Sequence, residues 1–224
     1  MKTRLLILAV CAMTMAACSK KNETTVTTDT RIKDGDGNVY DTVRIGAQVW
    51  LTENLKTTSY RNGDDIDEVS DSVQWSSTYT PAFCTYKNDS TYINEYGELY
   101  NWFAVHESRE LCPTGYHIPA DSEWTALINY LGTNAGGKLK ETGLMHWVSP
   151  NAGASDSSGF HALPGGDRYR TGEYNWDGKY GHWWAADTSL PGQARIIRLD
   201  YNGPNVYRTD RDKRDGYSVR CLKD

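Results

Sequence analysis

The clearest periodic pattern of apolar and polar positions lies between Pro119 and Gly132. Large apolar side chains recur there at the i, i+3, i+4 and i+7 spacing of an α-helix: Trp124, Leu127, Ile128 and Leu131. Gly132 follows the last of them, where a residue with left-handed backbone geometry is favoured at a helix C-terminus. The pattern predicts one main amphipathic helix packed on a sheet.

The start of this helix has half of a capping box. Glu123 stands where the acidic partner of the box belongs, but the residue three positions earlier is Ala120, which has no hydroxyl. Asp121 can cap the helix one residue later. A missing cap costs about 1 kcal/mol, which packing of the helix can offset.

Period-two alternation predicts an N-terminal hairpin. Residues 34–38 (DGDGN) form a tight turn, and alternating residues 39–45 then form a strand. Gly46 and Ala47 turn the chain into a second strand at 48–51. An EF-hand reading of 34–45 fails because Val39 and Ile45 occupy the positions that require Gly and Glu.

The C-terminal part predicts a closing sheet. It begins at 181–185 and continues through strands at 195–201, 205–209 and 217–222, with a turn at Asn202-Gly203. A short second helix is expected at 136–141, and a strand or short helix at 96–105. Residues 56–95 and the glycine-rich segment 143–182 lack periodicity, so they are expected to be irregular, and the second is expected to be a surface loop.

Several short pieces resemble the Fibrobacter succinogenes major paralogous domain family, over residues 32–224. They are 46–55 (GAQVWLTENL), 96–105 (YGELYNWFAV), 112–119 (CPTGYHIP), 136–143 (GGKLKETG), 159–168 (GFHALPGGDR) and 216–222 (GYSVRCL). The Ile-Pro-x-x-x-Glu-Trp piece is also similar to the formylglycine-generating-enzyme family. The resemblance implies an α+β, C-type-lectin-like domain: one main helix on short antiparallel strands, with long irregular loops.

The resemblance also bears on the cysteines and the chain ends. In a secreted chain Cys84, Cys112 and Cys221 allow three pairings of one disulfide. C-type-lectin-like domains join the start of the main helix to the last strand, which implies a Cys112–Cys221 bridge and a free, buried Cys84. The same fold places the hairpin at 39–51 beside the strand at 217–222.

Residues 1–18 have the pattern of a lipoprotein signal peptide. Lys2 and Arg4 precede a short apolar run, and Met-Ala-Ala then leads to Cys18. We expect lipidation at Cys18, a flexible tether at 19–31, and an outer-membrane protein that faces the periplasm or the cell surface. The alternative is an ordinary secretory signal with an incidental cysteine.

Charge and composition narrow the choice of partners. The chain has 24 Lys and Arg against 29 Asp and Glu, and removal of Lys2 and Arg4 with the signal peptide takes the net charge from −5 to −7. This unclustered acidic balance argues against nucleic acid and anionic membrane surfaces. The chain contains 8 Trp and 15 Tyr but only 3 Phe, and such amphipathic rings suit polar binding faces as well as the edge of a core.

The sequence contains no catalytic or metal motif that singles out a site. It has no Gly-x-Ser-x-Gly elbow, phosphate loop, dinucleotide fingerprint or His-Glu-x-x-His, and its five histidines lack ligand spacing. The formylglycine-generating activity is not implied, because Cys221 is the only cysteine beyond residue 112. Calcium is the one cofactor left open, because Asn175-Trp176-Asp177 is weakly similar to a lectin calcium element.

The candidate ligand surface combines the 165–187 region with the strand at 198–201. It brings aromatic rings that can stack on sugars close in sequence to charged groups that can orient a ligand. Its members are Trp176, Asp177, Tyr180, Trp183, Trp184, Asp187, Arg198 and Asp200. The competing interpretation is that the rings fill the core. Trp183 and Trp184 are adjacent on a strand, so one of them is expected to be buried.

These observations favour a tethered extracellular binding or adhesion module for glycan or protein. Two alternatives remain open, namely an extracellular glycan-modifying enzyme and a structural surface protein without a small ligand. Binding of a glycan would distinguish the binding module from the structural surface protein. Turnover that depends on one carboxylate would favour the enzyme.

Overall fold

A computed structural model describes residues 31–224, which form one compact unit. The predicted signal peptide, Cys18 and all but the last residue of the predicted tether lie outside the described residues. Within residues 31–224, no helix has the length and apolar character needed to cross a membrane.

Residues 31–224 form a mixed α and β structure with fourteen strands in small sheets and few helices. The strands are β1 (Ile32–Lys33), β2 (Val39–Tyr40), β3 (Thr42–Ile45), β4 (Gln48–Leu51), β5 (Asp67–Glu68), β6 (Ala82–Cys84), β7 (Leu99–Tyr100), β8 (Tyr116–His117), β9 (Gly165–Arg168), β10 (Tyr174–Asp177), β11 (Tyr180–Thr188), β12 (Gln193–Asp200), β13 (Val206–Asp212) and β14 (Leu222–Lys223). The helices are α1 (Ser72–Ser76), α2 (Ile93–Tyr96), α3 (Trp102–Val105), α4 (Asp121–Leu131) and α5 (Ala135–Leu139), with 3₁₀ turns η1 (Tyr86–Asn88) and η2 (Ser90–Tyr92).

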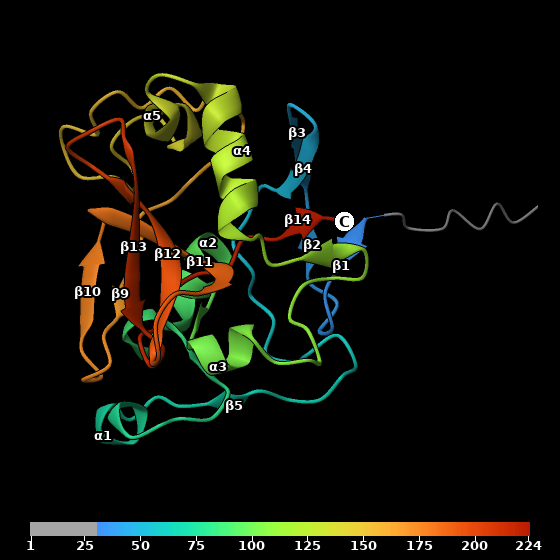
Figure 1. Cartoon of the computed structure of the whole chain (residues 1–224). Coiled ribbons are helices and arrows are strands. Elements are labelled where there is room, and N and C mark those ends of the chain that lie inside the picture. Colours follow the sequence, from blue (N-terminus) through green and yellow to red (C-terminus); the bar gives the residue numbers. More distant parts are fainter. Residues whose placement is uncertain (1–30) are drawn as a thin grey trace, which may run out of the picture. The chain divides into compact units, whose positions relative to one another are not determined.

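The longest strands form the central antiparallel sheet β11–β12–β13, and the β9–β10 hairpin lies against it (Figure 1). A second sheet has the order β3–β4–β14–β8, and β5–β6–β7 contains one parallel pair, β5 with β6. The strand expected at 39–45 is divided at Asp41, because β2 pairs with β1 whereas β3 pairs with β4. The segments at 56–95 and 143–182 contain short elements rather than continuous loop.

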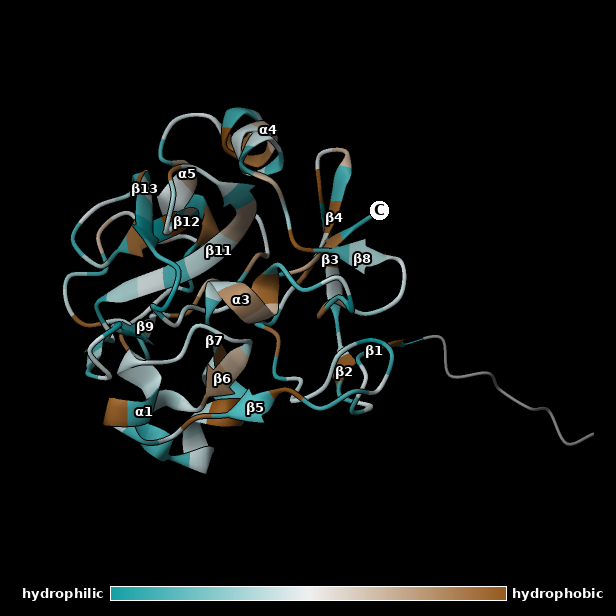
Figure 2. Cartoon of the chain, turned by 60° about the horizontal axis from the view of Figure 1, so that its bottom comes forward, coloured by the Kyte–Doolittle hydropathy of each residue, from teal (hydrophilic) through white to brown (hydrophobic). Residues whose placement is uncertain are grey.

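Both faces of the central sheet are covered, which decides where the tryptophans lie. Figure 2 shows α4 on one side of β11 and α3 on the other. Successive strand residues point to opposite faces, so Trp184 packs with Trp102 of α3 while Trp183 packs with Trp124 of α4. Both strand tryptophans are therefore buried, with 0% and 1% of their surface exposed.

The main helix forms as its periodicity predicts, and its N-terminus is capped from two sides. Ala120 is the N-cap residue, in place of the expected Asp121, and its N–H donates to the Glu123 carboxylate at 2.8 Å. The N–H of Asp121 donates to the carboxylate of Asp187, which lies in β11. Asp187 thus supplies the negative charge that a helix N-terminus favours.

The two ends of the domain meet as expected. Leu222 of β14 pairs with Trp50 of β4, and the hairpin at 39–51 therefore lies beside the last strand. The disulfide joins Cys112 to Cys221, and Cys84 is free and buried. Both cysteine expectations are confirmed.

Three buried cations hold the irregular segments to the core. They are Lys140, Arg168 and Arg220, each at most 1% exposed. Their acceptors are the carbonyls of Ala152, Asp200 and Gly203 for Lys140, those of Val69, Ser70 and Gly172 for Arg168, and the Leu51 and Phe160 carbonyls with the Asn54 side chain for Arg220. These donors satisfy buried carbonyls at places where no regular strand ladder is available.

Candidate functional site

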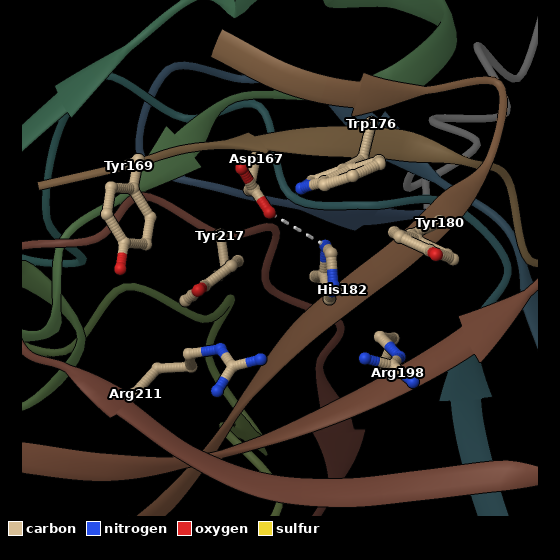
Figure 3. A pocket seen from close by; sticks show the side chains of 8 residues that line it. All are labelled: Asp167, Tyr169, Trp176, Tyr180, His182, Arg198, Arg211 and Tyr217. Carbon is tan, nitrogen blue, oxygen red and sulfur yellow. Dashed lines mark ion pairs between the residues drawn. The ribbon is translucent and has the colours of Figure 1, made fainter. Parts of the chain in front are cut away.

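A cavity of about 340 Å³ opens between the β9–β10 hairpin and the central sheet (Figure 3). It combines four aromatic rings with two arginines and one buried carboxyl–imidazole pair. Its lining residues are Asp167, Tyr169, Trp176, Tyr180, His182, Arg198, Arg211 and Tyr217. Because binding sites are typically concave surfaces with aromatic walls and a few polar groups, this cavity is the candidate site.

Strand register explains why residues far apart in sequence face the same cavity. Tyr180 and His182 are two positions apart on β11 and therefore share one face. His182 pairs with Arg198 of β12, and Arg198 pairs with Tyr207 of β13, so these three residues lie on the same face as Tyr180. The same face becomes apolar beyond His182, where Trp184 enters the core.

Trp176 lies at the rim, and its backbone is strained. Its side chain is 47% exposed, and its ring centroid is 5.1 Å from that of Tyr180. Its φ angle is +67°, in the left-handed region, which costs a bulky residue roughly 1–2 kcal/mol. Strained residues cluster at ligand-binding and active sites, which makes Trp176 a candidate contact residue.

The two arginines of the cavity differ in how their charges are compensated. The Arg198 guanidinium lies 2.8 Å from the Asp200 carboxylate and is flanked by the rings of Tyr180 and Tyr207, at 5.1 and 4.8 Å. Among residues 31–224, no carboxylate forms an ion pair with Arg211. Its hydrogen bond goes to the Asp210 carbonyl at 3.4 Å. Arg211 therefore brings an uncompensated positive charge to the cavity.

Asp167 and His182 form a buried pair in the cavity wall, with 3.3 Å between the Asp167 Oδ2 and His182 Nδ1 atoms (Figure 3). They are 5% and 4% exposed. Burial raises the pKa of Asp167 to about 8, and the neighbouring Asp215 adds to this effect. Burial lowers the pKa of His182 to about 3. The pair therefore holds one proton and no net charge across the neutral range.

This pair predicts a fall in stability at alkaline pH. In the folded protein it keeps one proton between about pH 3 and pH 8, whereas the unfolded residues release theirs near pH 3.8 and pH 6.5. Both states hold one proton between pH 3.8 and pH 6.5. Above pH 6.5 only the folded pair is protonated, so its contribution to stability declines as the pH rises to about 8.

Urea unfolding of wild type and Asp167→Asn, at about pH 6 and about pH 9, measures this contribution. The asparagine imitates the protonated acid and cannot ionise, so the variant is expected to lose less stability over this range. Glu98 also has a raised pKa, but burial and its neighbour Glu68 cause that shift, so its contribution is the same in both proteins and cancels in the comparison. Equal losses in the two proteins would contradict the assignment.

The structure brings together part of the candidate surface. Trp176, Tyr180 and Arg198 line the cavity, and Asp200 holds Arg198 in place. Asp177 points elsewhere: its carboxylate accepts hydrogen bonds from the Tyr86 hydroxyl at 2.9 Å and the Lys87 ammonium at 3.1 Å.

Three further candidates do not belong to the cavity. Trp183 and Trp184 are core residues, whose indole N–H groups donate to Asn54 and to the Tyr100 carbonyl. Asp187 caps α4. The sequence places both tryptophans among the ligand candidates and predicts that one of them is buried; both are buried, because the sheet is covered on both faces.

Five lining residues were not anticipated from the sequence: Asp167, Tyr169, His182, Arg211 and Tyr217. His182 could have been found, because it shares the alternation of Tyr180 on the same strand. Arg211 was missed because β13 continues to Asp212, three residues beyond the expected end at 209. Asp167 lies in the GGDR piece that carried the family resemblance.

Within residues 31–224, no group of three or more His, Cys, Asp or Glu side chains is arranged to hold a metal ion. In the weakly lectin-like Asn175-Trp176-Asp177 element, the Asp177 carboxylate is engaged by Tyr86 and Lys87. Asp34, in the turn at 34–38, accepts hydrogen bonds from Asn38 and Tyr40.

Comparison with known proteins identifies the family. The sequence model of the Fibrobacter succinogenes major domain matches residues 43–223, which is most of the chain. No curated protein matches the chain, and no solved structure does. The order of the short motifs and the extent of this match together show that the chain belongs to the Fibrobacter succinogenes major domain family.

Proposed function

We propose that the protein is an extracellular binding or adhesion module that takes carbohydrate in the cavity behind Trp176. The observation that carries the proposal is an exposed tryptophan held at positive φ beside Tyr180, at the mouth of a cavity that also contains arginines. Flat aromatic faces pack against sugar rings, while polar groups fix their orientation. Strained backbone positions cluster at ligand-binding sites, which favours a binding module over a structural surface protein.

The architecture supports a C-type-lectin-like domain as part of this proposal. One main helix packs on small, mostly antiparallel sheets, and the disulfide joins the segment before that helix to the residue that directly precedes the last strand. The first hairpin and the last strand are paired, so the domain closes on itself. The ligand cavity then lies on the β9–β11 region, which follows the helices in sequence.

A lipid anchor at Cys18 completes the proposal, with the domain displayed from the outer membrane toward the periplasm or the cell surface. Its support is the short apolar segment followed by Met-Ala-Ala-Cys. Membrane fractionation of a Cys18→Ser variant tests it, since a variant that stays in the membrane and is processed normally would contradict lipidation.

The Trp176→Ala variant is expected to weaken carbohydrate binding by roughly 30-fold or more, because an aromatic ring that stacks on the ligand contributes about 2 kcal/mol or more. Its free energy of unfolding should change by less than about 1 kcal/mol, since the ring is half exposed and a buried tryptophan would cost about 3–5 kcal/mol. A glycan array probed with wild type and variant, followed by calorimetric titration and urea unfolding, gives both quantities.

Tyr130→Ala is the matched control. Tyr130 is 66% exposed on α4 and does not line the cavity, so binding and stability should both be retained. A large destabilisation by Trp176→Ala, or unaltered binding, would count against the site. Wild type that recognises no carbohydrate on the array would count against the function itself.

The buried Asp167–His182 pair favours a second candidate, a glycan-modifying enzyme. A carboxyl group that keeps its proton near neutral pH beside a neutral imidazole is suited to proton transfer. Asp167→Asn distinguishes the two functions, because a binding module should keep its affinity whereas an enzyme should lose turnover of the bound glycan.

A further inference from the structure

We propose that the cavity selects carbohydrate that carries an anionic group, a carboxylate or a sulfate, and that Arg211 binds this group. The inference rests on the proposed function and specifies its ligand class. It starts from the local charge of the cavity, which is opposite in sign to the net charge of −5 on the whole chain.

Arg211 stands out among the arginines of its region. Five arginines lie between residues 195 and 214, and four of them are paired with a carboxylate: Arg195 with Asp210 at 2.8 Å, Arg198 with Asp200 at 2.8 Å, Arg208 with Asp121 at 3.3 Å and Arg214 with Asp212 at 2.8 Å. Within residues 31–224, Arg211 has no such partner and lines the cavity. A guanidinium without a counter-charge in a concave site favours an anionic ligand.

The carboxyl groups near Arg211 do not neutralise it. Asp167 shares the cavity, but burial keeps it protonated near neutral pH and it is paired with His182. Asp215 is fully buried, and it accepts hydrogen bonds from the Arg170 N–H at 2.7 Å and the Tyr217 hydroxyl at 3.2 Å. Among residues 31–224, neither Asp167 nor Asp215 forms an ion pair with Arg211, so its guanidinium remains available to a ligand.

The aromatic rings and Arg211 are placed to contact different parts of a ligand. Trp176 and Tyr180 present rings at one side of the cavity, and Arg211 lies on the opposite side, on β13 (Figure 3). A planar guanidinium can donate two parallel hydrogen bonds to a carboxylate or sulfate, whereas a neutral hydroxyl accepts fewer and gains no charge interaction. The rings therefore provide general affinity for sugars, and Arg211 provides selection for the acidic ones.

Calorimetric titration of the full chain tests the inference with matched probes. The carboxylate arm uses short oligogalacturonate and its neutral methyl ester, and the sulfate arm uses κ-carrageenan oligosaccharides, which have no carboxylates, and their neutral desulfated forms. In at least one arm, the anionic form is expected to bind at least about tenfold more tightly than its neutral counterpart. The arm that shows this preference identifies the anionic group.

Arg211→Gln is expected to remove that preference while leaving weak binding of the neutral form. Arg208→Gln is the matched control, because Arg208 lies on the same strand but pairs with Asp121 outside the cavity, and it should retain the preference. Polyaspartate, an acidic polymer without sugar, should bind much more weakly than the preferred glycan.

The outcomes separate this inference from the proposed function. Equal binding of acidic and neutral forms, with both lost in Trp176→Ala, would overturn the inference and leave the carbohydrate module standing. An acidic preference that survives Arg211→Gln, or polyaspartate binding as tight as glycan binding, would also overturn it. Absence of binding to every carbohydrate probe would overturn the proposed function as well.

Discussion

Replacing both Cys112 and Cys221 with alanine is expected to lower the free energy of unfolding by about 4–5 kcal/mol. The bridge spans 109 residues of sequence, so its loss greatly enlarges the unfolded ensemble. It also ties the segment before α4 to the residue that directly precedes β14, the strand that pairs with β4 and β8. Since small domains have a total stability of roughly 5–15 kcal/mol, much of the fold depends on this bond.

Urea unfolding of the double variant under non-reducing conditions measures the loss. Cys84→Ala is the control, because it removes a buried sulfur without opening a loop, and it should cost only about 1 kcal/mol. A double variant as stable as the control would show that the bridge contributes little. A peptide map that links Cys84 to either partner would contradict the pairing itself.

Replacing Arg220 with methionine is expected to cost on the order of 3 kcal/mol. Its guanidinium donates to the Leu51 carbonyl at 3.2 Å, the Phe160 carbonyl at 2.7 Å and the Asn54 side chain at 2.8 Å, and it lies 4.4 Å from the Phe160 ring centroid. Methionine fills some of the volume but donates no hydrogen bond, so these buried acceptors lose partners. Removal of a buried charge, whose pKa burial lowers to about 9, offsets part of the loss.

Arg44→Met provides the comparison, because the exposed Arg44 of β3 should change stability by no more than about 0.5 kcal/mol. Thermal unfolding and urea unfolding of both variants measure the two effects. If Arg220→Met were as stable as Arg44→Met, the buried cations would not be the elements that hold the irregular segments in place.

The elements with a strong local signal could be predicted from the sequence. Helix α4 follows from a stripe of four apolar residues, and the β3–β4 hairpin from alternation around Gly46. The Cys112–Cys221 bridge and the pairing of the first hairpin with the last strand came from family resemblance, and both are confirmed. The helix and the hairpin therefore follow from the local sequence pattern, and the disulfide and the pairing of the chain ends follow from the topology that the resemblance implies.

The remaining features depend on tertiary contacts that no local pattern reports. The alternation at 183 and 184 predicts that one of the two tryptophans is buried, but a sheet covered on both faces buries both. Asp187 looked like a ligand group and instead caps a helix 66 residues away in sequence. Arg211 lies in the last part of β13, beyond the expected end of that strand. Asp167 reaches the cavity because the β9–β10 hairpin folds onto β11.

The most direct test of the carbohydrate site follows the indole N–H signals of the tryptophans by two-dimensional NMR during titration with an array-selected glycan. The Trp176 signal, assigned with Trp176→Phe, is expected to shift with saturation. The signals of Trp183 and Trp184, whose indoles are hydrogen-bonded in the core, should stay in place. Saturable shifts that spare Trp176 and appear at other tryptophans would contradict the account.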